Sequence, residues 1–221
     1  MKIRAIITGA TGMVGEGVLI ECLKHPDVDQ VLIINRKPAG YSHPKLKEIV
    51  HADFFKLAPI EQQFEGYNAC FFCLGISSVG VKEPEYTKVT YDLTLNFART
   101  VFKYSPQLIF EYVSGMGTDS SEEGRSMWAR VKGKTENDLM KIGFPKVYGI
   151  RPGFMKPMKG MKYALGAYRY LDWMFPAIRK FFPGHVSTLE HVAKGMINAA
   201  KHSPTKAVLE VTDLVELSKI S

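Results

Sequence analysis

The sequence is poor in cysteine and contains no long apolar run. Its three cysteines, Cys22, Cys70 and Cys73, stand among 221 residues and are too few for the disulfide framework of a small secreted protein. No apolar stretch reaches the roughly 18 residues that a membrane-spanning helix needs, and Met1 leads into an apolar strand too soon for a signal peptide. These absences predict a cytoplasmic protein without a transmembrane segment.

Patterns typical of metal sites are also missing. Cys70 and Cys73 form a C-x-x-C motif, but residues three apart on a strand point to opposite faces, which argues against a disulfide or shared metal ligation. The six histidines have no companion cysteine or carboxylate cluster at ligand spacing. We therefore expect no metal site.

The formal charge of +7 is concentrated in the C-terminal half of the chain. Residues 1–124 carry 12 basic and 15 acidic side chains, whereas residues 125–221 carry 17 and 7. A basic half serves nucleic acid, an anionic membrane surface or a phosphorylated ligand in some proteins, but most often it is a solvated face. From length and composition we expect a single domain over residues 1–221 and no nucleic-acid partner.

A glycine-rich stretch near the N-terminus is the strongest local signal. The apolar run Lys2–Ile7 predicts a strand, and the spacing in Met13–Lys24 predicts a helix, so Gly9, Gly12 and Gly15 lie at a strand-to-helix turn. Such a turn binds a diphosphate, because the glycines allow a tight bend and the helix N-terminus presents N–H groups to the anion. A purely structural turn is the alternative, since the spacing is G-x-x-G-x-x-G rather than G-x-G-x-x-G.

The second predicted strand, Gln30–Ile34, is continuously apolar and ends at Asn35, Arg36 and Lys37. In NAD-selective sites an acidic residue at the end of this strand binds the adenosine ribose, whereas an arginine there accommodates the 2′-phosphate of NADP. Arg36 and Lys37 therefore predict a preference for NADP(H) over NAD(H). Two solvated cations after a strand are the alternative interpretation.

Strands and helices alternate along the rest of the chain. We expect strands at 46–51, 68–74, 107–113, 145–150 and 207–211, and helices at 59–64, 84–104, 127–142 and 187–202, with a short terminal helix. Ser126 is the expected N-cap of the third of these helices and Gly143 its stop, and Ser187 with Glu190 fits a capping box. This order predicts an α/β fold with a doubly wound, mostly parallel Rossmann sheet of about seven strands and helices on both faces.

Residues 154–184 differ in character from the rest, because cations alternate there with Met, Tyr, Trp and Phe. This composition predicts a substrate lid or a dimer contact. A basic amphipathic helix on an anionic membrane surface, or a protein contact, is the alternative. The sequence leaves monomer and homodimer open.

Six short motifs together resemble those of the atypical short-chain dehydrogenases/reductases, in particular the subgroup of the NADPH-binding oxidoreductase known as Tat-interacting protein. The motifs are Thr8–Gly15, Asn35-Arg36-Lys37, Ala52-Asp53, Phe72-Cys73-Leu74-Gly75, Val131-Lys132-Gly133 with Glu136, and Arg151-Pro152-Gly153. The resemblance runs nearly end to end, and it implies a Rossmann fold that binds a nicotinamide dinucleotide.

The resemblance also implies a set of cofactor contacts. For the diphosphate these are Thr11, Gly12, Met13 and Val14, with Gly9 and Gly15 shaping the turn. For the adenosine half they are Arg36 and Lys37 at the 2′-phosphate, Asp53 near the adenine, and Leu74 and Gly75 beside the adenosine and ribose. For the nicotinamide half they are Lys132 at the ribose, and Pro152 to Met155 flanking the nicotinamide.

Catalysis in that family usually rests on Ser, Tyr and Lys, with the last two spaced Y-x-x-x-K on one face of a helix. Ser114 and Lys132 match this pattern, but Trp128 occupies the tyrosine position. An indole N–H donates a hydrogen bond and does not titrate usefully, so Trp128 cannot replace the tyrosine as acid and base.

These observations predict an NADP(H)-dependent oxidoreductase acting on an unidentified carbonyl or alcohol. The proton would come from Lys132, water, the substrate or another tyrosine. The alternative is a catalytically weak or inactive regulatory protein that uses a bound dinucleotide to order residues 154–184 for a partner. Isomerase or lyase chemistry with internal recycling of the nicotinamide is a third interpretation.

Overall fold

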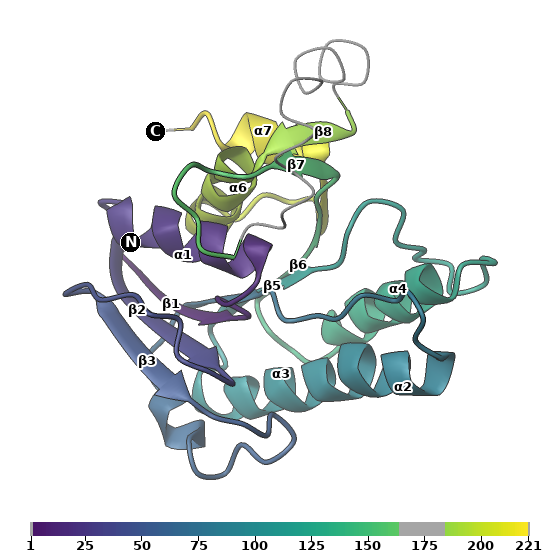
Figure 1. The fold of residues 1–221 in the computed structure, drawn as a ribbon, viewed down its shortest axis with the longest axis horizontal. Coiled ribbons are helices and arrows are strands. Elements are labelled where there is room, and N and C mark those ends of the chain that lie inside the picture. The colour runs from purple at the N-terminus through teal and green to yellow at the C-terminus, as the bar shows by residue number, and fades with distance from the viewer. Residues whose placement is uncertain (1, 164–183, 221) are drawn as a thin grey trace.

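The structure, a computed structural model, describes residues 2–163 and 184–220. A seven-stranded sheet lies at its centre, with helices on both faces, and every strand pairing in it is parallel (Figure 1). In spatial order the strands are β3 (Leu46–Val50), β2 (Val28–Asn35), β1 (Ile3–Thr8), β4 (Ala69–Phe72), β5 (Ile109–Val113), β6 (Lys146–Arg151) and β9 (Val208–Glu210). The predicted doubly wound sheet is confirmed.

The helices divide the interior into two apolar cores, one on each face of the sheet. One face carries α1 (Met13–Lys24), α6 (Leu189–His202) and α7 (Val211–Leu217). The other carries α2 (Glu83–Thr87), α3 (Leu93–Tyr104) and α4 (Met127–Leu139). Because both faces are covered, the central strands are buried on both sides and their sequences are continuously apolar rather than alternating.

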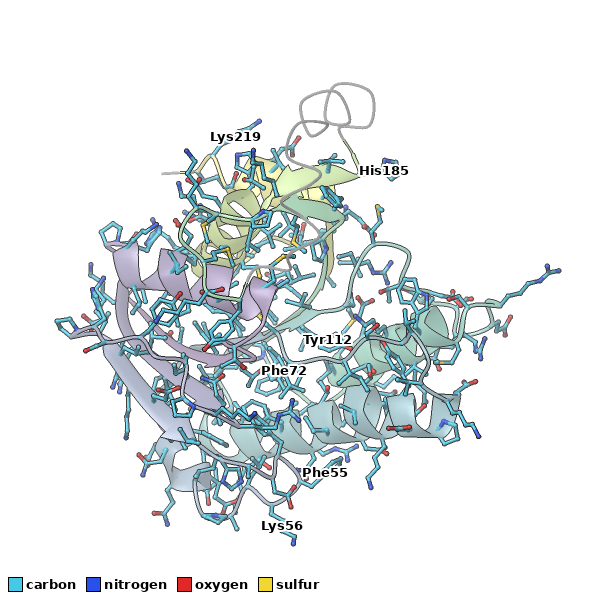
Figure 2. All side chains as sticks on the ribbon, viewed as in Figure 1. Phe55, Lys56, Phe72, Tyr112, His185 and Lys219 are labelled. Atoms are coloured by element: carbon cyan, nitrogen blue, oxygen red, sulfur yellow. The ribbon has the colours of Figure 1, made fainter. Side chains whose placement is uncertain are left out.

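The aromatic side chains of β4 and β5 fill the core on the α3 side. Phe72 and Tyr112 lie on the sheet side of α3, above that helix in the view of Figure 2, with their ring centroids 6.1 Å apart. Phe97 of α3 packs on Phe72, with the two ring centroids 5.4 Å apart. This packing fixes the carboxyl ends of β4 and β5, from which the loops of the candidate site begin.

Three predicted helices differ in detail from the observed ones. The helix predicted at 84–104 is α2, a π-helical turn at Lys88–Asp92, and α3. The helix predicted at 59–64 is a 3₁₀ turn at Glu61–Phe64. The helix predicted at 127–142 ends at Leu139, because Lys141 and Ile142 donate i→i−3 bonds of 3.2 Å to Asp138 and Leu139, which tighten the last turn.

Of the two predicted N-caps, Ser126 is correct in place and Ser187 is not. Ser126 is the N-cap of α4, although its hydroxyl makes no capping hydrogen bond. The predicted capping box at Ser187 is wrong, since Thr188 caps α6 by accepting a 3.1 Å bond from the His191 N–H. Ser187 instead lies in β8 (Val186–Thr188), which pairs in parallel with β7 (Phe154–Lys156) in a two-stranded sheet that the sequence did not predict.

Residues 164–183 of the predicted lid or contact segment lie outside the described part of the chain. Residues 154–163 are described and run from β7 toward α1 (Figure 1).

Candidate dinucleotide and active site

The strand-to-helix turn is packed so tightly that it requires glycine at two positions. Gly9 has φ +71°, and a Cβ there would lie 2.8 Å from the carbonyl carbon of Cys73. A Cβ on Gly15 would lie 2.2 Å from the carbonyl oxygen of Gly9, because α1 begins directly against the turn. The Gly12 N–H donates to Gly9 O at 2.9 Å and closes the bend. At its glycines the turn therefore presents bare backbone at the N-terminus of α1.

A pocket of about 150 Å³ lies beside this turn, at the carboxyl edge of the sheet. Its lining combines predicted cofactor residues with residues that the sequence reasoning missed. The predicted ones are Gly9, Thr11, Gly12, Arg36, Leu74 and Gly75. The missed ones are Ile34, Asn35, Phe54 and Cys73. Ligands of open α/β sheets bind at this edge, so the pocket lies where a dinucleotide would be expected.

Asn35, the last residue of β2, organises the edge of the pocket. Its side-chain oxygen accepts a 3.1 Å bond from the Ala10 N–H, and its amide donates to Glu48 at 3.1 Å. The same Glu48 oxygen accepts from the Ala39 N–H at 2.8 Å. Asn35 therefore ties the glycine turn to the loop after β2. A polar residue at the end of an apolar strand was the signal that could have revealed it.

The remaining predicted adenosine contacts lie at the surface or outside the pocket. Arg36 and Lys37 are both exposed, and only Arg36 lines the pocket. Asp53 is exposed and folds back on its own turn, accepting from the Phe55 N–H at 3.0 Å, while Phe54 lines the pocket in its place.

The other predicted cofactor contacts pack in or against the interior of the fold and do not line the pocket. Met13 and Val14 of α1 pack against the apolar core on that face rather than lining the pocket. Met155 is buried in the same core, and the Pro152 carbonyl accepts a 3.0 Å bond from the Met116 N–H. The structure thus does not bring these residues into the pocket lining that contains Arg36 and Gly75.

The Ser114 hydroxyl points into a buried polar network. It donates to Glu136 at 2.5 Å, and the Ile150 carbonyl lies 3.1 Å away. Arg151 faces the same carboxylate, with Nη2 at 2.5 Å and Nε at 3.2 Å. A guanidinium that engages both carboxylate oxygens compensates the cost of burying the charges. The sequence reasoning noted Glu136 and Arg151 only as parts of motifs and missed their pairing, because nothing local links positions 15 residues apart on a helix and a strand.

Lys132 and Trp128 lie one helical turn apart on α4. The Lys132 ammonium donates to the backbone carbonyl of Ser114, not to its hydroxyl. Burial lowers the pKa of Lys132 from its ordinary 10.5 to about 8, and the Glu136 carboxylate opposes this shift. The Trp128 ring lies close to Gly117, where its Cη2 would be 3.4 Å from an added Cβ. The three predicted catalytic residues therefore meet at the loop after β5, but the serine hydroxyl is already bonded.

The cysteines do not form a reactive site. Cys73 lines the pocket, and burial, reinforced by the Glu111 carboxyl group, raises the pKa of its thiol, which keeps it protonated. Cys22, Cys70 and Cys73 are free thiols. In residues 2–163 and 184–220, no group of three His, Cys, Asp or Glu side chains is arranged to hold a metal ion.

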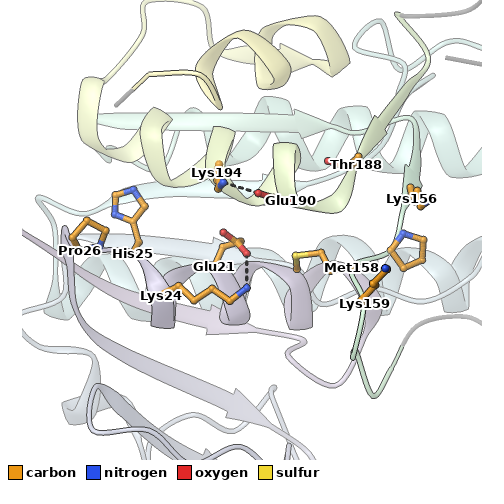
Figure 3. A pocket seen from close by; sticks show the side chains of 11 residues that line it. Glu21, Lys24, His25, Pro26, Lys156, Met158, Lys159, Thr188, Glu190 and Lys194 are labelled. Carbon is orange, nitrogen blue, oxygen red and sulfur yellow. Dashed lines mark hydrogen bonds and ion pairs between the residues drawn. The ribbon is translucent and has the colours of Figure 1, made fainter. Parts of the chain in front are cut away.

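A larger groove of about 630 Å³ lies between α1 and α6 (Figure 3). Each helix contributes one ion pair to its lining, Glu21 with Lys24 at 3.2 Å on α1 and Glu190 with Lys194 at 2.6 Å on α6. None of the predicted site residues lines it. We therefore assign the candidate site to the smaller pocket.

Among the described helices, none is both long and apolar enough to cross a membrane.

The sheet order and the glycine turn define a Rossmann-type fold, which comparison with solved structures supports. MoeE5 in complex with UDP-glucose and NAD matches with a TM-score of 0.65 and 15% identity, over 97% of this chain and 80% of that chain. UDP-N-acetylglucosamine 4-epimerase from Methanobrevibacter ruminantium matches with a TM-score of 0.66 and 17% identity, over 98% of this chain and 81% of that chain. A short chain dehydrogenase family protein from Francisella tularensis matches with a TM-score of 0.61 and 17% identity, over 89% of this chain and 90% of that chain. At these identities the likeness shows the fold.

Curated relatives come from fungi. Protein FMP52, mitochondrial, from Debaryomyces hansenii is 24% identical over 220 residues, which cover 98% of this chain and 96% of that protein. Protein FMP52-2, mitochondrial, from Scheffersomyces stipitis is 28% identical over 158 residues, 70% of this chain and 67% of that protein. No family model matches the chain.

The prediction of a cytoplasmic protein is contradicted by these relatives, because each is named as a mitochondrial protein. The prediction rested on the few cysteines and on the lack of a signal peptide. Neither feature separates the cytoplasm from other reducing compartments, so the sequence argument had no means to detect the difference.

Proposed function

We propose that this protein binds NADP(H) and acts as a short-chain dehydrogenase/reductase-like oxidoreductase on an unidentified carbonyl or alcohol. The observation that carries the proposal is the pocket at the carboxyl edge of β1, β2 and β4, where Gly9, Gly12 and Arg36 meet. Structures with this fold are described in complex with NAD, which supports a nicotinamide dinucleotide as the cofactor. The resemblance to the Tat-interacting protein subgroup stays a prediction.

The residues of the turn are suited to a dinucleotide. The bare backbone at Gly9 and Gly12 allows a diphosphate to approach the N-terminus of α1, whose dipole favours an anion. Arg36 at the end of β2 is suited to a 2′-phosphate, and Glu48, the carboxylate of the neighbouring strand, is engaged by Asn35 and Ala39. NADP(H) is therefore the preferred form in this proposal.

The catalytic part of the proposal assigns proton handling to Lys132. The cofactor, when bound, supplies the hydride. Burial lowers the pKa of Lys132 to about 8. The amine therefore holds its proton at neutral pH and can release it at a pH only slightly higher. Trp128 would donate a hydrogen bond or stack on a ring, and Ser114 would keep Glu136 in place.

The second candidate function is a dinucleotide-binding regulatory protein without appreciable turnover. The Ser114 hydroxyl favours it, because this group donates to buried Glu136 and Ser114 does not line the pocket. Both candidates assume a single domain over residues 1–221. In the regulatory protein, residues 154–184 would bind a partner. In the oxidoreductase, they would form a substrate lid or a contact with a second copy of the chain. The names of the fungal relatives support a mitochondrial location in either case.

A thermal-shift titration with NADPH and NADH in parallel tests the shared part of both candidates. Ligand at 100 times its Kd stabilises a protein by about 2.7 kcal/mol, which amounts to several degrees for a chain of this size, at about 2–4 °C per kcal/mol. We expect a larger shift with NADPH than with NADH. No shift with either, in protein shown to carry no nucleotide, would mean that the glycine turn is structural.

A further inference from the structure

Glu16, in the first turn of α1, collects hydrogen bonds from two distant parts of the chain. The side chain is fully buried directly after the glycine turn. One oxygen accepts from the Tyr41 hydroxyl and from the Lys162 N–H, each at 2.5 Å, and the other accepts from the Tyr163 N–H at 2.7 Å. Bonds to a carboxylate are stronger than neutral ones, so Glu16 fixes residues 162–163 against the start of α1.

Residues 162–163 in turn bind the loop that follows β2. The Lys162 ammonium donates to the Gly40 carbonyl and lies 4.3 Å from the centroid of the Tyr41 ring. The Tyr163 hydroxyl donates to the Ala39 carbonyl at 3.3 Å. Together with Tyr41 on Glu16, these contacts hold Ala39 to Tyr41 from two sides.

The same loop has a second anchor at its start. Glu48 accepts from Asn35 at 3.1 Å and from the Ala39 N–H at 2.8 Å, as described above. Arg36, Lys37 and Pro38 are exposed and span the gap between these two fixed residues. The short bridge is therefore ordered before any ligand arrives, which lowers the entropy lost when its side chains bind one.

We propose that Glu16, with its donors from Tyr41, Lys162 and Tyr163, is a positioning residue that sets the preference for NADP(H) by holding the Arg36 loop in place. The inference rests on the proposed function, whose 2′-phosphate contact is Arg36. It adds that this preference depends on residues 162–163, more than 120 positions away from the loop.

The arrangement also makes the coupling reciprocal. If residues 162–163 detach, Glu16 loses two of its three donors, and Gly40 and Ala39 lose their bonds from Lys162 and Tyr163. The Arg36 loop is then held less firmly, which weakens the contact proposed for the 2′-phosphate. Binding of NADPH and attachment of residues 162–163 therefore stabilise each other, as linkage requires.

The test compares Glu16→Gln and Tyr41→Phe with a matched control, Tyr91→Phe. The control removes a similar tyrosine-to-carboxylate bond, 2.8 Å from Tyr91 to Asp138, on the opposite face of the sheet. Kd values for NADPH and NADH are measured by fluorescence titration, and exchange of the Lys162 and Tyr163 amides is followed by mass spectrometry. Tyr41→Phe is the variant that removes one bond and keeps the carboxylate, in case Glu16→Gln does not fold.

We expect Glu16→Gln to raise the Kd for NADPH about tenfold and that for NADH about twofold, with a smaller change of the same kind in Tyr41→Phe. In wild type, NADPH should slow exchange of both amides, and Tyr91→Phe should behave as wild type. Equal losses for the two nucleotides, or amide exchange that NADPH does not alter, would overturn the inference and leave the proposed function intact. Failure of wild type to bind either nucleotide would overturn both.

Discussion

The cofactor half and the catalytic half of the candidate site are built from different interactions. Gly9 and Gly15 shape the cofactor half by the absence of side chains, so the backbone itself forms the surface that faces a ligand. In the catalytic half, Ser114, Glu136 and Arg151 bond to one another in the interior. The first half is open toward a ligand and the second is satisfied without one, which suggests that binding here demands less of the protein than turnover does.

The largest expected effect breaks the cofactor half. Gly15→Ala should destabilise the protein by about 3 kcal/mol, because the added Cβ meets the Gly9 carbonyl oxygen and that backbone cannot move easily. It should also abolish nucleotide binding. Urea denaturation and thermal shift with NADPH measure the two effects.

Gly12→Ala is the matched control for this change. The nearest atom to its added Cβ is 3.4 Å away, so the variant should fold with stability close to wild type while still weakening the nucleotide. If Gly15→Ala were as stable as wild type, the close approach of helix and turn would not be what glycine provides there.

The second prediction asks whether the catalytic half lacks only an acid. Trp128→Tyr should raise turnover of a generic carbonyl with NADPH about 100-fold, since general acid catalysis contributes on that order. NADPH oxidation at 340 nm measures the rate, and Trp128→Phe, which supplies no titratable group, should give no gain. No gain with tyrosine, in a variant that still binds NADPH, would favour the regulatory function.

The third prediction sharpens the difference between the two nucleotides within the cofactor half. Arg36→Asp should raise the Kd for NADPH about tenfold more than that for NADH, because a carboxylate replaces the cation at the position proposed for the 2′-phosphate contact. Lys37→Asp should act more weakly, since Lys37 does not line the pocket. Equal losses for both nucleotides would remove the basis for the Arg36 assignment.

The last prediction concerns Lys132 and pH, and its effect on stability is gradual. Its pKa is lowered to about 8 in the folded protein, from 10.5, so between these values the unfolded chain binds the proton more tightly. The free energy of unfolding of wild type, relative to Lys132→Gln, should therefore rise with pH from about 8 to 10 and stay level below. The slope is at most about 1.4 kcal/mol per pH unit. Parallel urea titrations measure it, and a flat difference would contradict the burial of the amine.

The sequence was sufficient to predict those parts of the structure that depend on local pattern. The apolar strands, the helix after Gly12 and the glycine turn follow from periodicity and from backbone requirements within a few residues. That information is contained in short windows, so the sheet and the position of the glycine turn were predicted correctly.

The parts that were missed depend on contacts between distant residues. Asn35 resembles the end of any strand until Ala10 and Glu48 are seen beside it. Glu16 reads as an ordinary acidic residue in a first helical turn, although two of its partners, Lys162 and Tyr163, lie 146 and 147 positions away. Ser187 and Thr188 are equally good N-caps by composition, and only the pairing of β8 with β7 decides between them.

The β7–β8 pair has a consequence for how the chain can change in length. The register of Phe154 with Val186 joins the two ends of the 29 residues from 157 to 185. The entropy cost of closing a loop grows only with the logarithm of its length, about 0.6 kcal/mol per doubling. Because the pair anchors both ends beside the sheet, insertions between them that leave Lys162 and Tyr163 on Glu16 keep the central strands in register. The pair therefore lets the chain between its two strands vary in length at little cost in stability.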